Sequence, residues 1–189
     1  MPETTLQEPW RSFLHDLDTL VDGPVELHCL GGFVIAELYD FARVTADVDV
    51  IHVRGATPVA LADLAGQGSE LHRRHKVYLD IVTVASVPEN YQERLIDLFP
   101  GEFRNLRLKA FERHDLVLAK LARNIDRDRE DVKRLAAGPG LDPQVLKQRY
   151  ETELRYQFGR PEREDLTLEL WLEMIQEVQQ TRHEDPAAG

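Results

Sequence analysis

Residues 28–53 read HCLGGFVIAELYDFARVTADVDVIHV, and this stretch decides how the chain is organised. Its hydrophobic pattern alternates between strand and helix periods and is interrupted by a pair of glycines. The pattern predicts, in order, a strand over Leu27–Leu30, a turn at Gly31 and Gly32, a helix over Phe33–Phe41, a loop over Ala42–Ala46 and a strand over Asp47–Val53.

Two aspartates lie two residues apart at the start of the second predicted strand. Because strand side chains alternate between faces, Asp47 and Asp49 project from the same side, and Val48 and Val50 project from the other. Carboxylates that share a face repel each other unless a positive charge lies between them, and a divalent metal ion commonly supplies it. At the glycine turn, backbone N–H groups that begin a helix can approach a phosphate with no side chain in the way.

A third carboxylate stands in the clearest strand of the chain, Val77–Val84, which reads VYLDIVTV. Asp80 is the only acidic residue in this apolar run, and we expect it to be buried. An unpaired carboxylate in a buried strand is unfavourable unless an ion pair or a metal compensates for it. If the two strands are neighbours, Asp47, Asp49 and Asp80 can converge on one or two Mg²⁺ ions and act on a phosphoryl group.

The rest of the chain predicts helices and strands in alternation up to about residue 112, and helices only after that. Helices are expected over Thr5–Val21, Val59–Ala65, Ser69–His75, Tyr91–Phe99, residues 114–124, residues 126–137, Asp142–Phe158 and Glu162–Gln180, and a strand over Leu106–Phe111. This order indicates an α+β fold, a small mixed β-sheet with flanking helices followed by a helical C-terminal part. We expect residues 1–137 to form the first domain and residues 138–189 a C-terminal helical segment packed on it.

The composition is that of an ordinary globular protein. The chain has 189 residues, of which 42% are hydrophobic and 30% charged, and this is enough for a sizeable core. The one cysteine, Cys29, excludes an intrachain disulfide and is expected in the core. No long apolar run predicts a membrane span, and no signal peptide is recognisable at the N-terminus, so a cytoplasmic protein is expected. The seven histidines show no zinc-binding spacing.

The net charge of −11 argues against a general nucleic-acid binder. The positive side chains are concentrated between Arg104 and Arg149, with a smaller group at His72–Lys76. From charge alone this concentration is compatible either with a local phosphate-binding surface or with solvated helix faces.

The segment 31–53 resembles the signature of the nucleotidyltransferase (polymerase β-like) superfamily, in which a double glycine precedes two metal-binding aspartates on a strand and a third carboxylate follows on a later strand. The spacing Arg43-x-Thr45-x-Asp47-x-Asp49 is similar to that of toxin nucleotidyltransferases of the AbiEii and MenT type and of their small uncharacterised relatives. Residues 115–121 (DLVLAKL) and 127–135 (RDREDVKRL) are similar to a further motif of that family.

The resemblance covers about residues 25–137 and implies roles for individual residues. Asp47, Asp49 and Asp80 would be the catalytic metal ligands, and Asp80 could serve as general base. The expected nucleotide-binding residues are Gly31, Gly32, Thr45, Lys120, Arg127 and Asp131. If one continuous helix carried them, Lys120, Arg127 and Asp131 would share a face; a surface lysine is the alternative for Lys120. Arg43 is expected to pair with the aspartate cluster.

The activity that the resemblance implies is Mg²⁺-dependent transfer of a nucleoside monophosphate from an NTP to a hydroxyl acceptor, an RNA 3′ end or a protein. Mn²⁺ could replace Mg²⁺. The family points to a toxin–antitoxin or phage-defence component, with tRNA or an antitoxin protein as acceptor or regulator, and neither DNA nor a membrane as partner. Two alternatives remain open: a non-catalytic nucleotide-binding or antitoxin-like protein-interaction module of the same fold, and a phosphohydrolase that uses the same carboxylates.

Overall fold

The computed structural model describes residues 6–39 and 45–184, with side chains up to Arg182. The chain forms two compact units, each with its own core. Unit 1 comprises Met1–Ala85 and Leu95–Phe111, and unit 2 comprises Ser86–Arg94 and Glu112–Gly189. The functional division expected at residue 137 stays a prediction.

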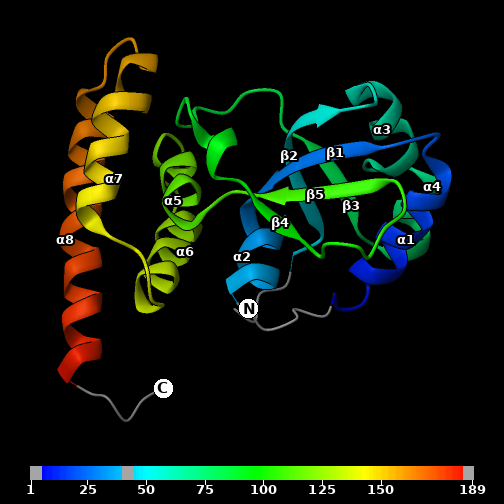
Figure 1. Cartoon of the computed structure of the whole chain (residues 1–189). Coiled ribbons are helices and arrows are strands. Elements are labelled where there is room, and N and C mark those ends of the chain that lie inside the picture. Colours follow the sequence, from blue (N-terminus) through cyan, green and yellow to red (C-terminus); the bar gives the residue numbers. More distant parts are fainter. Residues whose placement is uncertain (1–5, 40–44, 185–189) are drawn as a thin grey trace. The chain divides into compact units, whose positions relative to one another are not determined.

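Unit 1 is built on a five-stranded mixed sheet with the strand order β3-β2-β1-β5-β4 (Figure 1). The central strand β1 pairs antiparallel with β2 and parallel with β5. On the outside, β3 runs parallel to β2, and β4 runs antiparallel to β5. The strands are β1 (Val25–Leu30), β2 (Asp47–Arg54), β3 (Tyr78–Ile81), β4 (Ile96–Leu98) and β5 (Leu106–Ala110).

One face of this sheet is apolar and forms the core of unit 1. Leu27 and Cys29 of β1, Val48 and Val50 of β2 and Leu108 of β5 are almost completely buried. The residues between them are polar on each of these strands, so the other face carries charged and polar side chains. An antiparallel or mixed sheet that is covered on one side only gives this alternation.

Four helices complete unit 1 and lie against the sheet or against one another (Figure 1). The helix α1 follows the expected amphipathic pattern and buries Trp10, Phe13, Leu14 and Leu17. Its buried Asp18 accepts hydrogen bonds from the backbone N–H groups of Arg104, Asn105 and Leu106, and so joins α1 to the start of β5. The helices are α1 (Trp10–Leu20), α2 (Gly31–Tyr39), α3 (Pro58–Ala65) and α4 (Glu70–His75).

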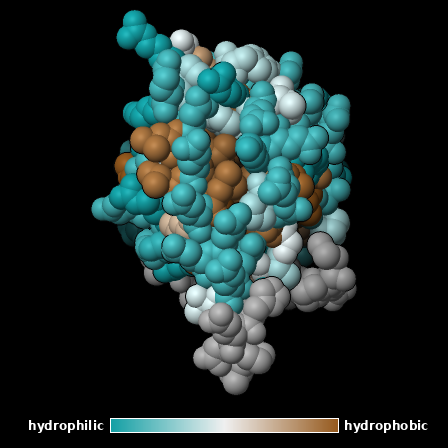
Figure 2. Space-filling model, turned by 90° about the vertical axis from the view of Figure 1, so that its left-hand side faces the viewer, coloured by the Kyte–Doolittle hydropathy of each residue, from teal (hydrophilic) through white to brown (hydrophobic). Residues whose placement is uncertain are grey.

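Unit 2 is helical. Its long elements are α5 (Arg113–Leu121), α6 (Asp126–Ala137), α7 (Pro143–Arg149) and α8 (Glu162–Glu184), and short helical turns lie at Tyr91–Arg94, Tyr150–Leu154 and Arg155–Gln157. Figure 2 shows apolar side chains gathered on the face to which the C-terminal helices contribute, and Leu166 and Leu170 of α8 are 57% and 56% exposed. In the described part of the chain, no helix combines the length and the apolar character that crossing a membrane requires.

The α+β class and the small mixed sheet are confirmed, but three predicted elements are wrong. Tyr91–Phe99 is a short 3₁₀ turn followed by β4, because Ile96 and Leu98 alternate with Asp97 and pair with β5. The strand predicted over Val77–Val84 ends at Ile81. The helix predicted over Asp142–Phe158 ends at Arg149 and continues as a π turn and a 3₁₀ turn.

Candidate functional site

The sheet brings the three predicted carboxylates together. Asp47 and Asp49 lie on β2, and the parallel register with β3 sets Asp49 beside Asp80. Each residue offers one carboxylate oxygen, and these three oxygens lie within 4.8 Å of one another. Neighbouring residues of adjacent strands project to the same face, so the convergence follows directly from the register.

Asp80 is exposed and not buried as its apolar neighbours indicated. The reason is that β3 is an edge strand whose Asp80 face is the polar face of the sheet, whereas Leu79 points into the core and is 2% exposed. Val84, the last residue of the predicted strand, lies beyond β3 and is 90% exposed. The argument for a functional Asp80 therefore rests on its two carboxylate neighbours and not on burial.

Gly31 makes room for Asp49. Gly31 opens α2 with φ +76°, and a Cβ atom placed on it would lie 1.7 Å from Oδ2 of Asp49. Only a residue without a side chain fits such a position, and glycine also adopts a positive φ at little cost. Gly32 is buried in the first turn of α2. The double glycine thus sets the Asp49 carboxylate against the start of a helix, whose N–H dipoles favour negative charge.

Thr45 holds the other aspartate of β2. Its hydroxyl donates a hydrogen bond of 2.6 Å to Oδ1 of Asp47. The resemblance assigned Thr45 to the triphosphate, but in the structure its hydroxyl is engaged with the carboxylate that would bind metal. Arg43, the expected partner of the cluster, lies outside the described residues.

The carboxylates make their surroundings electronegative. Burial and then the negative charges of Asp47, Asp80 and Asp49 raise the pKa of Tyr78. Burial and the charge of Asp49 also raise the pKa of Cys29, which lies in the core as expected. Both neighbours are therefore kept neutral, and a cation bound between the carboxylates would reduce their mutual repulsion.

The geometry and chemistry of the cluster fit a hard divalent cation. Oxygens that share one Mg²⁺ at 2.0–2.1 Å lie at most about 4.2 Å apart. The three carboxylate oxygens lie within 4.8 Å of one another, so small side-chain rotations would let all of them bind one Mg²⁺ ion. Three carboxylates with no nitrogen or sulfur ligand suit Mg²⁺ or Mn²⁺.

Lys120 is buried in unit 2, where it contacts two carboxylates. Its ammonium group lies 2.8 Å from Oδ2 of Asp131 and 3.3 Å from Oδ1 of Asp128. Arg123 also binds Asp128, through two nitrogen atoms. Only 5% of Lys120 is exposed, so the alternative of a surface lysine is wrong.

The three predicted residues of this motif do not share one helix face. The helix α5 ends at Leu121, Asn124 has φ 45°, and α6 begins at Asp126, so the helix is not continuous. Lys120 and Asp131 still meet because α6 folds back, whereas Arg127 is exposed. Their nucleotide-binding role stays a prediction.

Sequence reasoning missed Asp128 and a second charge network in unit 2. Asp115 is completely buried and binds Arg94 on one side and Arg149 on the other. Arg149 and His114 both contact Glu112. The acidic residue in the apolar stretch of α5 was the available signal for Asp115, because a buried charge requires a partner. Nothing local in the sequence identified Arg94 or Arg149 as those partners.

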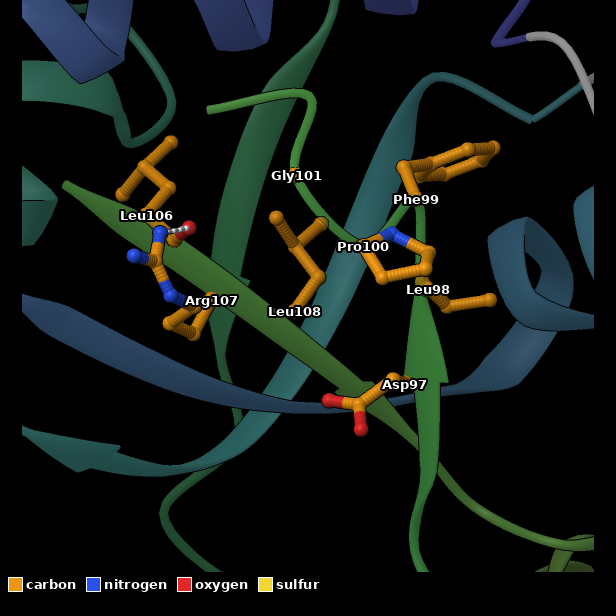
Figure 3. Close-up of a pocket in the computed structure, with 8 residues that line it drawn as sticks. All are labelled: Asp97, Leu98, Phe99, Pro100, Gly101, Leu106, Arg107 and Leu108. Atoms are coloured by element: carbon orange, nitrogen blue, oxygen red, sulfur yellow. Dashed lines mark hydrogen bonds between the residues drawn. The ribbon is translucent and has the colours of Figure 1, made fainter. Parts of the chain in front are cut away.

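A small cavity of about 210 Å³ lies at the other edge of the sheet, between β4 and β5 (Figure 3). Its walls combine apolar groups with one acidic and one basic side chain. It is lined by Asp97, Leu98, Phe99, Pro100, Gly101, Leu106, Arg107 and Leu108. The three aspartates do not line this cavity but lie on the polar sheet face.

Comparison with known proteins gives one match. The model of a protein family described as "Nucleotidyltransferase of unknown function (DUF6036)" matches residues 14–179, which is most of the chain. No curated protein and no solved structure matches the chain. The matched range includes both aspartate strands and, in unit 2, α5, α6, α7 and α8 as far as residue 179.

Proposed function

The chain belongs to this family of nucleotidyltransferases of unknown function, and from that premise we propose that it is a Mg²⁺-dependent enzyme that transfers a nucleoside monophosphate from an NTP to a hydroxyl acceptor. The observation that carries the proposal is the convergence of Asp47, Asp49 and Asp80 on one sheet face. Retention of all three carboxylates favours a catalyst over a binding module that has lost its ligands.

Each site residue of unit 1 has its own role in the proposed reaction. Asp47 and Asp49 would hold the metal, which supplies charge stabilisation at the α-phosphate and the leaving oxygen. Thr45 fixes the orientation of Asp47, and Gly31 leaves the space that Asp49 occupies. Preorganised ligands lose little entropy when they bind, so both contacts should raise metal affinity.

In this proposal Asp80 is the general base. In the proposed reaction the acceptor oxygen forms a bond to the α-phosphorus, and the bond between that phosphorus and the bridging oxygen of the β-phosphate breaks. The acceptor hydroxyl gives its proton to the Asp80 carboxylate, which later releases it to water, and pyrophosphate leaves. Exposure of Asp80 gives both the acceptor and water access to it.

The wider setting of the activity is part of the same proposal. The acceptor would be an RNA 3′ end or a protein hydroxyl, and the chain would act in the cytoplasm as part of a toxin–antitoxin or phage-defence system. A tRNA or an antitoxin protein would then be its acceptor or regulator, and Mn²⁺ could substitute for Mg²⁺ because both accept oxygen ligands.

Incubation of the purified chain with each α-labelled NTP, Mg²⁺, RNA and protein acceptors tests the activity. We expect label on an acceptor, stoichiometric pyrophosphate, and loss of both in Asp47→Ala. Asp63→Ala is the matched control, because Asp63 is exposed on α3 of the same unit and outside the cluster. Absence of transfer to any acceptor, together with absence of metal-dependent NTP binding by calorimetry, would overturn the proposal. Release of free nucleotide to water alone would identify the hydrolase instead.

A further inference from the structure

A tyrosine lies beside the aspartates on the polar face of the sheet. The parallel register sets Asp47 beside Tyr78 and Asp49 beside Asp80. Because residues paired on adjacent strands project to the same face, these four side chains lie together on one face. Tyr78 is half-buried. The candidate metal site therefore has an aromatic ring as its immediate neighbour.

The ring of Tyr78 contacts His72 of α4. The two ring centroids lie 5.0 Å apart, and the ring planes make an angle of 64°, which is an edge-to-face contact. His72 is itself fixed, since its Nδ1 accepts a hydrogen bond of 2.8 Å from the N–H of Gly68 and its backbone N–H donates one of 3.1 Å to the hydroxyl of Ser69. An edge-to-face partner favours one ring orientation and covers at most one face of the tyrosine ring. Tyr78 is thus a preorganised aromatic surface beside Asp47.

The proposed reaction assigns different parts of the substrates to the two sides of Asp49. The start of α2, at Gly31, favours the phosphates that leave. Asp80 lies on the opposite side, because β2 separates β3 from β1, and it receives the proton of the acceptor. In an in-line displacement the attacking and leaving oxygens lie on opposite sides of the α-phosphorus. The reaction axis then runs across the strands from Asp80 to Gly31, and the nucleoside projects away from that axis.

A nucleoside that follows the strands can project in either of two directions. Toward Asp47 it reaches Tyr78, which lies one strand spacing, about 4.8 Å, from Asp47. In the other direction lies the ring of His52, whose centroid is 4.8 Å from that of His28. His28 is 2% exposed, and the register of β1 and β2 shifts between Asp49 and His52. Tyr78 is therefore the better placed of the two rings to contact a base.

We propose that the ring of Tyr78, oriented by His72, stacks on the base of the bound NTP and gives the site a preference for purine nucleotides. This inference rests on the proposed transferase activity and names the class of NTP that it uses. An aromatic ring stacks on every base, because each base has a π-face, and the strength of stacking differs between bases. The two fused rings of a purine cover more of a phenol ring than the single ring of a pyrimidine does, and so remove more apolar surface from water. We therefore expect ATP and GTP to bind more tightly than CTP and UTP.

Calorimetric titration with nucleotides and with inorganic tripolyphosphate tests the stacking contact without catalysis. Tripolyphosphate has the phosphates of an NTP but no base. In the presence of Mg²⁺, Tyr78→Leu should weaken ATP binding by about 5- to 150-fold, the range for stacking of a base on an aromatic side chain. The same variant should bind tripolyphosphate as the wild type does, because the ring contacts only the base. The preference for ATP and GTP over CTP and UTP should disappear in Tyr78→Leu.

Further variants separate stacking from folding. Tyr78→Phe keeps the ring and should restore the ATP affinity that Tyr78→Leu loses. His72→Ala should weaken ATP binding by a smaller factor, because the tyrosine ring stays but loses its edge-to-face partner, and it should leave tripolyphosphate binding unchanged. His15→Ala is the matched control, since His15 lies on α1 of the same unit, is 45% exposed and also contacts an aromatic ring, that of Phe103. It should leave both affinities unchanged.

Several outcomes would overturn the stacking role. An equal loss of ATP and tripolyphosphate affinity in Tyr78→Leu would show that the tyrosine only supports the fold of the site. Unchanged ATP affinity in Tyr78→Leu would exclude the contact, and a loss of ATP affinity in His52→Ala instead would assign the base to the other ring. Equal affinities of the wild type for the four NTPs would overturn the purine preference.

Steady-state kinetics relate the ring to the transferase. A contact that is equally strong in the ground state and the transition state affects KM and not kcat, so Tyr78→Leu should raise the KM for ATP with little change in kcat. Transfer with an unchanged KM in Tyr78→Leu would overturn the inference and leave the proposed function intact. ATP binding that depends on Tyr78, without transfer to any acceptor, would overturn the proposed function instead. Absence of Mg²⁺-dependent binding of both NTPs and tripolyphosphate to the wild type would overturn both.

Discussion

Two groups of aspartates, one in each unit, have opposite surroundings. In unit 2, Asp128 and Asp131 are buried and share the ammonium group of Lys120. In unit 1, Asp47 and Asp80 lie on a sheet face open to solvent, and within residues 6–39 and 45–184 no lysine, arginine or histidine forms an ion pair with either of them. The chain neutralises the first group itself and leaves the second available to a cation from solution.

This difference is the one expected between a charge cluster that stabilises a fold and one that binds a ligand. Burying a charge is tolerated only when the partner is fixed in place, so the Lys120 cluster is complete without any ligand. Carboxylates that stay partly hydrated have a smaller desolvation cost. A metal ion bound between them would remove their remaining electrostatic repulsion, which favours binding of the ion. Similar aspartate pairs are therefore suited to stability in unit 2, and under the proposed function they would bind a metal ion in unit 1.

The largest expected effect is on catalysis. Asp80→Asn removes the proton acceptor and one metal ligand, and we expect transfer to fall by about 10³-fold, equivalent to about 4 kcal/mol. Stability should stay the same or rise slightly, because a like-charge contact is lost. Thermal unfolding and NTP turnover measured on one preparation check both parts. A loss of folded protein in Asp80→Asn would mean that the triad is structural, and the comparison would fail.

Lys120→Ala should show the reverse pattern in unit 2. It leaves Asp128 and Asp131 without their shared buried cation, and we expect a loss of about 3 kcal/mol or more in the free energy of unfolding. Urea denaturation followed by Trp171 fluorescence in a Trp10→Phe background reports on this unit, since the chain has two tryptophans, one in each unit.

Lys133→Ala is the matched control for this test. Lys133 lies on α6 and pairs with Glu130 at the surface, where such pairs contribute little, so its removal should change stability by less than about 0.5 kcal/mol. Equal stability of Lys120→Ala and Lys133→Ala would show that the buried cluster is not needed for folding.

A smaller effect distinguishes two glycines that both have positive φ. Gly31→Ala places a methyl group against the Asp49 carboxylate, and we expect Mn²⁺ affinity, followed by electron paramagnetic resonance, to fall about 10- to 100-fold. Gly68 has φ +86° and open space around the added atom, so Gly68→Ala should cost roughly 1–2 kcal/mol of stability and leave metal affinity unchanged. Equal metal affinities in the two variants would exclude Gly31 as a determinant of the site.

The smallest predicted effect is a loss of stability at low pH. Burial alone raises the pKa of Glu112, but His114 and Arg149 outweigh it and lower the pKa to about 2. A carboxylate with a lowered folded-state pKa stabilises the fold above its unfolded value of about 4.5, and this contribution is lost as the pH falls toward 2. After allowance for partial exposure, we expect unit 2 to lose about 1–2 kcal/mol between pH 5 and pH 2 through this group.

Glu112→Gln should flatten this pH dependence, because the titrating group is gone. Glu130→Gln, at a 60% exposed position, should leave the pH dependence as it is. An identical acid transition in Glu112→Gln and the wild type would show that other carboxylates dominate the loss of stability.

The local features of the site could be read from the sequence. The strand alternation set Asp47 and Asp49 on one face, and the double glycine located the start of a helix, because both depend on neighbours within a few residues. The prediction failed where a residue's surroundings come from distant segments. Asp80 was expected in the interior, but β3 is an edge strand, and the helix over Tyr91–Phe99 gave way to β4 because β5 offered a pairing partner.

By itself, the sequence determined the α+β class, the residue types of the candidate metal site and the strands that carry them, since hydrophobic period and side-chain chemistry are local properties. Tertiary structure decided which charges are neutralised. Helix packing places the ammonium group of Lys120 against Asp131 and Asp128. Strand register places Asp80 beside Asp49, and it places Lys109 and Arg54 on the same sheet face. Electrostatic partners are set by distance in space, and distance between segments far apart in the chain is fixed only when strand register and helix packing are fixed.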